Sequence, residues 1–185
     1  MSESLAGQFL IATPAIGDSR FKGSVILICA HNDEHAMGVV VNDVMAELTL
    51  FELLEQLGID EPNGEDAPVL SGGPVARDRG FVLHSDDYDC PGVTVPVMDG
   101  ICLTTSRDIL EKMSSKDRPE RAILALGYAG WTGGQLEQEI VANAWLTAPA
   151  DLGIVFDHAF ETKWGRALAS IGVSPDRLQW DSGTA

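Results

Sequence analysis

The sequence predicts an α+β fold in which a mixed, mostly antiparallel sheet curls into a pseudo-barrel with about four flanking helices. The first observation is a set of nine short runs of β-branched and aromatic residues that Gly and Pro separate, as is typical of strands. The second is four amphipathic segments with helix signals at their ends. Because strands and helices do not alternate as βαβ units, a parallel α/β sheet is disfavoured.

The expected strands are five to seven residues long and rich in apolar side chains. They lie near residues 7–12, 24–30, 37–42, 67–71, 80–84, 93–97, 100–104, 121–127 and 152–156. Residues 25–28 and 39–41 are continuous apolar runs rather than alternating ones, so both faces of these two strands should be covered.

The first expected helix begins at Thr49, because Glu52 three residues later completes a capping box, and it ends at Gly58. The other three expected helices have apolar residues at helical spacing. The second begins near Thr105 or Ser106, the third runs from about residue 135 to 143, and the fourth follows Asp157 as an N-cap.

The length and composition predict a single domain over residues 1–185, since 45% of the residues are hydrophobic and 22% are charged. The longest aliphatic run, residues 25–30, is far shorter than the roughly 20 residues of a membrane helix. No Lys or Arg precedes Arg20, so the basic region of a secretory signal is not evident. We therefore expect a cytoplasmic protein with no membrane partner.

The chain is strongly acidic: 12 Lys and Arg stand against 28 Asp and Glu, which gives a net charge of −16. Residues 1–100 hold 4 of the basic residues and 17 of the acidic ones. A DNA-binding surface must neutralise phosphates with cations. The one basic cluster, at Lys112, Lys116, Arg118 and Arg121, has acidic residues between its members, which is typical of a solvated helix end and loop. No direct nucleic-acid partner is expected.

Metal and redox sites have little support in the sequence. Cys29, Cys90 and Cys102 include no Cys-x-x-Cys pair, which argues against a zinc knuckle or a disulfide framework and leaves a redox role open. His31 and His35 have the i, i+4 spacing of metal ligands on a helix. They lie between two expected strands, however, and a hairpin turn need not bring the rings together. Neither a metal site nor a cofactor is predicted.

The most unusual segment is 127–140, where four glycines surround a Tyr and a Trp before a helix opens. One hypothesis is a shallow ligand pocket near Tyr128, with Trp131 as its floor and Gln135 and Glu139 as polar lining, because ligands often dock at glycine loops that carry aromatic residues. The alternative is purely structural: a strand, a glycine turn that packs an aromatic residue, and an acidic first helical turn.

Two other segments offer candidate residues. Gly72 and Gly73 follow an expected strand and would let backbone amides approach an anion, although a tight turn is the favoured explanation. His84 has hydrolase-type neighbours in the sequence HSDD, but adjacent residues rarely form a triad, and no Gly-x-Ser-x-Gly motif occurs. A hydrolase-like enzyme, with His84 and Glu137 or Glu139 as acid and base, is therefore the alternative function.

Motifs along the chain match one family in order: GQFLIATP at 7–14, Phe21 with SVI at 24–26, HN at 31–32, AMGVVVN at 36–42, GGPV at 72–75, RGFVLH at 79–84, GYAGW at 127–131, GQLEQEI at 134–140, NAW at 143–145, FD at 156–157 and Trp164. Over about residues 5–180 the chain thus resembles the AlgH/YqgE family of bacterial proteins. The resemblance implies an α+β pseudo-barrel, a cytosolic location, and a regulatory label that comes from a member linked genetically to alginate production. It implies no established reaction. Asp43 and His35 depart from the basic residue and the Gly that are usual in the family.

We therefore expect a regulatory protein that binds a protein or a small-molecule partner and has no catalytic residue. The candidate pocket comprises Asn42, Gly72, Gly73, His84, Tyr128, Trp131, Gln135 and Glu139. A direct transcription factor is the third hypothesis, and it predicts salt-sensitive binding to duplex DNA.

Overall fold

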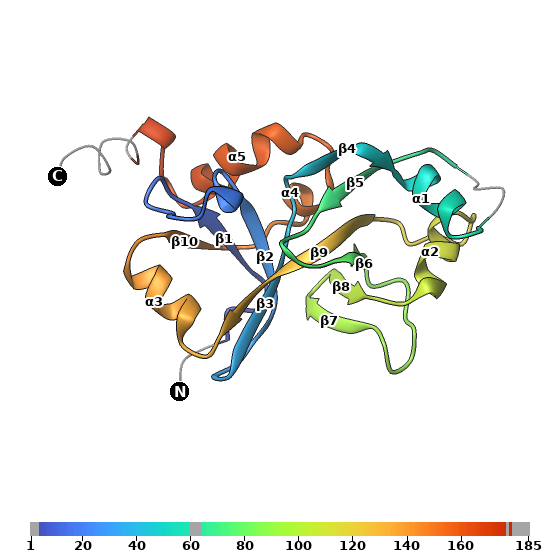
Figure 1. The fold of residues 1–185 in the computed structure, drawn as a ribbon, viewed down its shortest axis with the longest axis horizontal. Helices are drawn as coiled ribbons and strands as arrows, with labels where there is room; N and C mark the ends of the chain where they lie inside the picture. Colours follow the sequence, from blue (N-terminus) through green and yellow to red (C-terminus); the bar gives the residue numbers. More distant parts are fainter. Residues whose placement is uncertain (1–3, 60–63, 177, 179–185) are drawn as a thin grey trace.

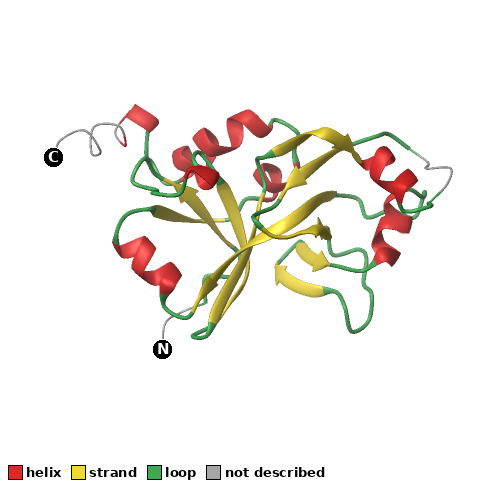
Figure 2. Ribbon diagram, viewed as in Figure 1, coloured by secondary structure: helices red, strands yellow, loops and turns green. Residues whose placement is uncertain are grey.

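The structure is a computed structural model, and it describes residues 4–59, 64–176 and 178. Within these residues, ten strands form one sheet, and five α-helices and two short 3₁₀ turns pack around it (Figures 1 and 2). All strand pairs in this part of the chain are antiparallel except one, and the sheet curls into a half-barrel. The predicted α+β class with a curled, mostly antiparallel sheet is therefore confirmed.

The strands are β1 (Gln8–Ala12), β2 (Val25–His31), β3 (His35–Val40), β4 (Val44–Thr49), β5 (Pro68–Ser71), β6 (Val75–His84), β7 (Val95–Met98), β8 (Ile101–Thr104), β9 (Ala122–Thr132) and β10 (Trp145–Pro149). The helices are α1 (Leu50–Gln56), α2 (Arg107–Met113), α3 (Gln135–Val141), α4 (Leu152–Phe156) and α5 (Lys163–Ser170), and the 3₁₀ turns are η1 (Ser19–Phe21) and η2 (Phe160–Thr162). The strand order is β10-β1-β2-β3-β9-β6-β8-β7, and β4 pairs with β5, which runs parallel to β9.

The long strand β9 connects the two halves of the sheet (Figure 1). Its last residues, from Ala129 to Thr132, pair with β3, whereas its first half, from Ala122, pairs with β5 and β6. Between the two halves lies Gly127, whose φ is 82°. A Cβ there would lie 2.4 Å from the carbonyl oxygen of Gly73, so only glycine fits. The loop before β6 is therefore pressed against the midpoint of β9.

Side chains are buried on both faces of the half that contains β1 and β2. Phe9 and Ile11 enter one apolar cluster with α4 and α5, whereas Leu10 enters a second cluster with α3. A third cluster packs α1 and α2 against β5, β6 and β9. The apolar runs at 25–28 and 39–41 are buried throughout, which confirms that both faces of these strands are covered.

Three of the four predicted helices begin where the sequence places them. Thr49 caps α1 by accepting a hydrogen bond from the Glu52 amide at 3.4 Å, and Gly58 follows the helix with φ of 75°. Ser106 is the N-cap of α2, and α3 begins at Gln135. Of these three helices, only α1 has a side-chain hydrogen bond at its N-cap, so the starts of α2 and α3 do not depend on one.

The prediction that Asp157 caps the last helix is wrong. Thr162 precedes α5, and η2 intervenes between Asp157 and that helix. Asp157 instead accepts hydrogen bonds from the Ala159 amide at 3.2 Å and from Arg166 at 2.9 Å. Asp157 therefore stabilises the turn that precedes α5 and forms an ion pair with Arg166 of that helix.

The strand predicted at 152–156 is also wrong, because this segment forms α4. Asp151 caps it by accepting a hydrogen bond from the Ile154 amide at 3.1 Å. A short apolar run does not distinguish a strand from a buried helix, and here the cap decides. Two strands, β4 and β10, were missed, since their residues become strands by pairing with β5 and β1 rather than by local pattern.

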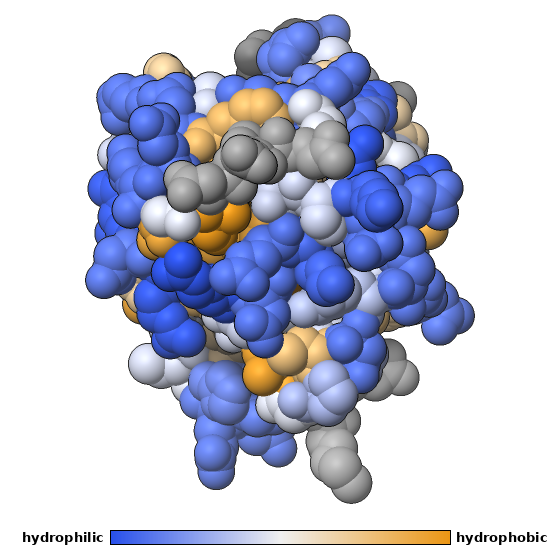
Figure 3. Space-filling model, turned by 90° about the vertical axis from the view of Figure 1, so that its right-hand side faces the viewer, coloured by the Kyte–Doolittle hydropathy of each residue, from blue (hydrophilic) through white to orange (hydrophobic). Residues whose placement is uncertain are grey.

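The surface beside α1 and α2 is mostly hydrophilic, and its apolar side chains form small separate patches (Figure 3). Scattered apolar residues of this kind are normal on a globular protein. No helix in the described part of the chain is both long and apolar enough to cross a membrane.

Candidate functional site

Two neighbouring cavities lie where the halves of the sheet meet, and they share Arg20, Phe21 and Pro74. The larger has a volume of about 420 Å³ and reaches from the η1 segment to α3. The smaller has a volume of about 240 Å³ and reaches from η1 to the β3–β4 connection and the start of β6. Together they are the central cleft, lined by Ile16, Gly17, Asp18, Arg20, Phe21, Val40, Asp43, Ser71, Gly73, Pro74, Val75, Arg77, Gly130, Trp131, Gln135, Glu139 and Ala144.

On the α3 side of the cleft, Glu139 fixes two indole rings. Its Oε1 accepts hydrogen bonds from the Nε1 atoms of Trp131 at 3.1 Å and Trp145 at 3.0 Å, and its Oε2 accepts one from Gln135 Nε2 at 3.0 Å. The side-chain Oε1 of Gln135 in turn accepts from the Thr132 amide at 3.1 Å. Three donors make this carboxylate a fixed anchor between α3, β9 and β10. Trp131 is only 5% exposed, so it is part of the wall rather than an open floor.

The η1 turn forms the opposite side of the cleft. Asp18 accepts hydrogen bonds from the Arg20 amide at 2.9 Å and from the Arg20 guanidinium, with Nη2 at 2.6 Å. The guanidinium lowers the pKa of Asp18, and the carboxylate raises the pKa of Arg20. The Phe21 ring meets Trp145 edge-on at 5.7 Å between centroids. This wall is therefore braced against the indole pair that Glu139 holds.

Gly72 and Gly73 allow the chain before β6 to approach β9 closely. A Cβ on Gly73 would lie 2.1 Å from the Tyr128 carbonyl carbon, and one on Gly72 would lie 2.3 Å from the Gly127 oxygen. Gly72 also donates to the Leu126 oxygen at 2.8 Å. The close backbone contact explains both glycines, and of the two only Gly73 lines the cleft.

Asn42 and Tyr128 lie next to the cleft, but their side chains are used elsewhere. The Asn42 amide accepts from the Val25 amide at 2.9 Å and donates to the Gly23 oxygen at 2.9 Å, which fixes the start of β2. The Tyr128 ring packs edge-on against Phe81 at 5.4 Å. Both residues are therefore structural supports of the cleft rather than lining residues.

His84 lies far from the cleft, at the other end of β9. It pairs with Ala122, whereas Trp131 is nine residues further along β9, about 30 Å of extended strand. His84 is fully buried, while Glu137 and Glu139 are on α3. The hypothesis that His84 forms an acid–base pair with either glutamate is therefore wrong.

The hydrogen bonds of His84 indicate a structural role. Its Nδ1 lies 2.7 Å from the Ser85 carbonyl, which can only accept, so Nδ1 carries the proton. Its Nε2, 2.7 Å from Thr104 Oγ1, then accepts from that hydroxyl, and Thr94 Oγ1 lies 2.8 Å from Thr104 Oγ1. Burial lowers the pKa of His84. The ring is thus a neutral link between β6 and β8.

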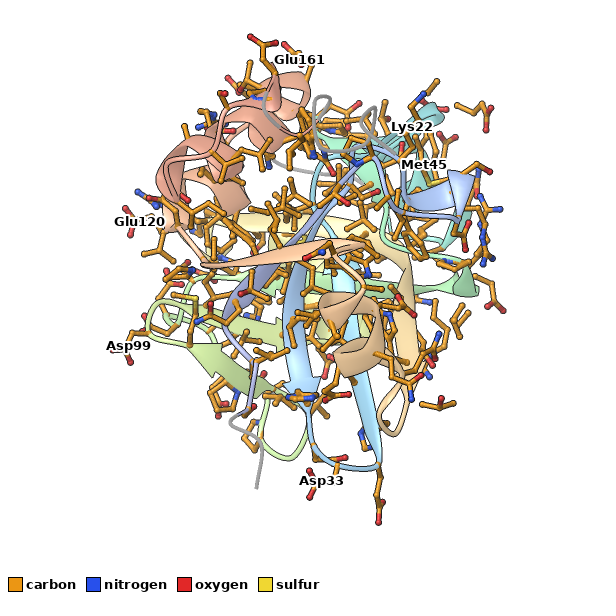
Figure 4. The ribbon with its side chains drawn as sticks, turned by 90° about the vertical axis from the view of Figure 1, so that its left-hand side faces the viewer. Lys22, Asp33, Met45, Asp99, Glu120 and Glu161 are labelled. Carbon is orange, nitrogen blue, oxygen red and sulfur yellow. The ribbon has the colours of Figure 1, made fainter. Side chains whose placement is uncertain are left out.

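The two histidines of the β2–β3 hairpin do not converge. His31 Nδ1 accepts from the Leu5 amide at 3.0 Å, and its Nε2 donates to Glu137 Oε1 at 2.5 Å, while His35 is exposed. Among the described residues, no group of His, Cys, Asp and Glu has the geometry of a metal site. In Figure 4, Asp33 at the tip of this hairpin lies at the opposite end of the molecule from Lys22 after η1.

Three residues that were not among the predicted site residues also line the cleft: Arg20, Asp43 and Arg77. A usable signal was present: residues 1–100 contain only four basic residues, Arg20, Lys22, Arg77 and Arg79, and two of them meet here. Burial raises the pKa of Asp43, and the nearby charge of Arg77 partly opposes this.

Both the sequence and the fold of this chain match known proteins. The AlgH-like family model matches residues 9–176. Proteins named UPF0301 protein from Caulobacter vibrioides and Methylocella silvestris are 49% and 48% identical over 99% and 98% of this chain and 95% and 92% of their own length. The solution structure of the AlgH protein from Pseudomonas aeruginosa has a TM-score of 0.80 and 38% identity, and the match covers 100% of this chain and 99% of that one. A crystal structure from Corynebacterium diphtheriae, 22% identical with a TM-score of 0.71, shares the fold over 90% of this chain and 87% of that one.

Proposed function

This chain belongs to the AlgH-like family, and we propose that it is a cytoplasmic regulatory protein that binds a small molecule in the central cleft and catalyses no reaction. All three cysteines are free, which supports a reducing compartment. Direct contact with DNA is not part of the proposal, because the net charge of −16 opposes it.

The observation that carries the proposal is the composition of the central cleft. Small-molecule sites are concave, have volumes of roughly 300–1,000 Å³, and combine apolar walls with a few fixed polar groups. The larger cavity of about 420 Å³ has this size, with Phe21 and Trp131 as apolar wall and Gln135 and Glu139 as polar groups. The hydrogen bonds of Glu139 hold these groups in place without a ligand.

Binding is favoured over catalysis because the described residues that line the cleft include no histidine and no cysteine. Among the described lining residues, Ser71 has the only hydroxyl group, and no His or Cys lies with it. A general base must lie within hydrogen-bond reach of the proton that it removes. The carboxylate of Glu139 already accepts three hydrogen bonds from the protein.

A ligand screen by NMR tests the proposal. ¹⁵N-labelled protein is titrated with metabolite mixtures, and we expect saturable shifts at amides of the η1 segment, residues 71–77 and residues 130–139. Val75 lines the cleft and is 39% exposed, so Val75→Trp fills the cavity without entering the core. We expect this variant to lose binding.

Val95→Trp is the matched control, since Val95 is a 50% exposed strand residue on β7 that does not line the cleft. It should bind as the parent does. The proposal fails if no mixture shifts the cleft amides, or if Val75→Trp binds every hit with the parental affinity.

A further inference from the structure

Building on the proposed function, we propose that the ligand of the central cleft is a small anion whose phosphate or carboxylate group is held by Arg77 and Arg20. Both arginines line the smaller cavity of about 240 Å³. Nε and Nη2 of Arg20 already donate to Asp18, so the paired donors open to a ligand are those of Arg77, and Arg20 adds its charge beside them. Arginine binds these two kinds of anion through the same planar pair of N–H donors.

A large bulge in β6 presents Arg77. Val75 pairs with Tyr128 and Gly80 pairs with Leu126, so residues 76–79 of β6 lie opposite one residue of β9, Gly127. Bulges of this kind re-aim side chains and are frequent beside functional sites. The bulge therefore takes Arg77 out of the regular ladder, and Arg77 lines the smaller cavity.

The backbone of this bulge is unfavourable for its sequence. Ala76 has φ of 49°, in the left-handed region that residues with a Cβ rarely adopt. The Cα of Arg77 lies 3.4 Å from the position that a Cβ on Gly127 would take, so a glycine below the bulge makes room for it. Strained backbone that the surrounding structure holds in place is often found at ligand sites.

Arg77 is exposed, and no acceptor among the described residues is paired with its guanidinium group. Arg20, Arg107 and Arg166 each have a carboxylate partner. Within the described residues Arg77 makes no hydrogen bond or ion pair, and its electrostatic partner is Asp43. Its donors are therefore available to a ligand at no loss of an internal contact.

Asp43 lies in the same cavity as Arg77 and opposes an incoming anion. Its carboxylate is partly desolvated, which raises its pKa. Removing this negative charge should strengthen anion binding, and removing the positive charge of Arg77 should weaken it. Opposite effects from two neighbouring residues are not expected of a purely structural cleft.

The overall charge limits the ligand to a small anion. With a net charge of −16, the surface as a whole repels a polyanion, but screening at physiological salt restricts this repulsion to about 8 Å. An anionic group that enters the smaller cavity meets Arg20 and Arg77 as well as Asp43, whereas a nucleic acid would also meet the net negative charge of the rest of the molecule.

The test uses the full chain, with pyrophosphate and citrate as separate probes at constant ionic strength in NaCl. We expect saturable ¹⁵N amide shifts at residues 20–21, 43 and 71–77 with at least one probe, and which probe binds tells phosphate from carboxylate chemistry. Arg77→Gln should weaken binding about tenfold, as expected for a lost charge-assisted hydrogen bond. Asp43→Asn should tighten it about threefold.

Lys116→Gln is the control, because it removes the same charge from an exposed residue that does not line the cleft. It should bind as the parent does. Since Arg77 has no internal hydrogen bond, Arg77→Gln should also keep the parental Tm.

Absence of saturable cleft shifts with both probes overturns the inference, as does binding that Arg77→Gln leaves unchanged. If neutral metabolites bind the cleft while neither anion does, the inference falls and the proposed function stands. If no compound of any charge binds there, both fall.

Discussion

Replacing Glu139 tests whether one carboxylate holds the cleft together. In Glu139→Ala, the indoles of Trp131 and Trp145 lose a charged acceptor, and these rings are 5% and 1% exposed, so water has little access to replace it. A hydrogen bond to a charged group contributes about 1.5–3 kcal/mol. For two such bonds we expect the free energy of unfolding to fall by about 3–6 kcal/mol, a large share of the 5–15 kcal/mol typical of a domain.

The conservative variant Glu139→Gln separates hydrogen bonding from packing. Its amide oxygen still accepts from both indoles, but its NH₂ group faces the Nε2 donor of Gln135, so we expect a loss of about 1 kcal/mol. Glu161→Ala, at an exposed glutamate labelled in Figure 4, is the charge-matched control and should stay within about 0.5 kcal/mol of the parent.

Urea unfolding gives the free energies, and the indole N–H signals of the two tryptophans in ¹⁵N NMR report the hydrogen bonds directly. We expect both signals to move upfield in Glu139→Ala. A loss below about 1 kcal/mol together with unmoved indole signals would refute the assignment of Glu139 as the anchor.

The remaining predictions concern pH, glycine and DNA. Burial lowers the pKa of Lys163 from 10.5 to about 8, so the unfolded chain binds more protons in this range and stability should rise from pH 8 to 10.5 by at most about 3 kcal/mol. In Lys163→Met, the free energy of unfolding measured in urea should no longer rise over this pH range. Burial raises the pKa of the Cys29 thiol to about 12, which lowers stability as pH rises, but this effect is the same in both proteins. The pKa of His84 is also lowered, so the free energy of unfolding should decrease as pH falls below 6.5. This decrease should be smaller in a His84→Gln variant that still folds. Gly73→Ala should unfold at a far lower urea concentration than the parent, because its Cβ overlaps the backbone of β9. A Cβ at Gly165 in α5 meets nothing within 4 Å, so in Gly165→Ala the free energy of unfolding should rise by up to about 1 kcal/mol. An electrophoretic shift assay with duplex DNA at low salt should show no complex, and a salt-sensitive complex would restore the transcription-factor hypothesis.

The elements that the sequence predicted best are those whose signals are local. The N-cap signal at Thr49 and the uninterrupted apolar run at 25–28 each act within a few residues of chain, and α1 begins at that cap while the run is buried as predicted. The Glu52 carboxylate accepts from the Thr49 hydroxyl. The segment 152–156 failed because its five apolar residues fit a strand or a helix equally well, and a cap at Asp151 decided between them. The missed strands β4 and β10 depend on partners that are far away in sequence.

The candidate site residues also differ in how far their positions depend on nearby sequence. Trp131, Gln135 and Glu139 were found together because they lie within nine consecutive residues, and all three line the cleft. His84 was grouped with them by residue type alone, yet the antiparallel pairing of β6 with β9 places it at the far end. Arg77 was missed because its position depends on a bulge, and a bulge is a property of two paired strands rather than of either sequence.

The position of the cleft follows from how β9 serves two halves of one sheet. A strand of 11 residues that pairs with β3 at one end and with β5 and β6 at the other must change partners near its middle, at Gly127. At that change the ladder is interrupted, so β6 can bulge and the loop after β5 can press on β9. Side chains from both halves then face the same gap, and this accounts for the meeting of Arg77 from one half with Trp131 and Glu139 from the other around one cleft. Shortening the bulge by deletion should therefore close the cleft while the two halves of the sheet keep their pairing.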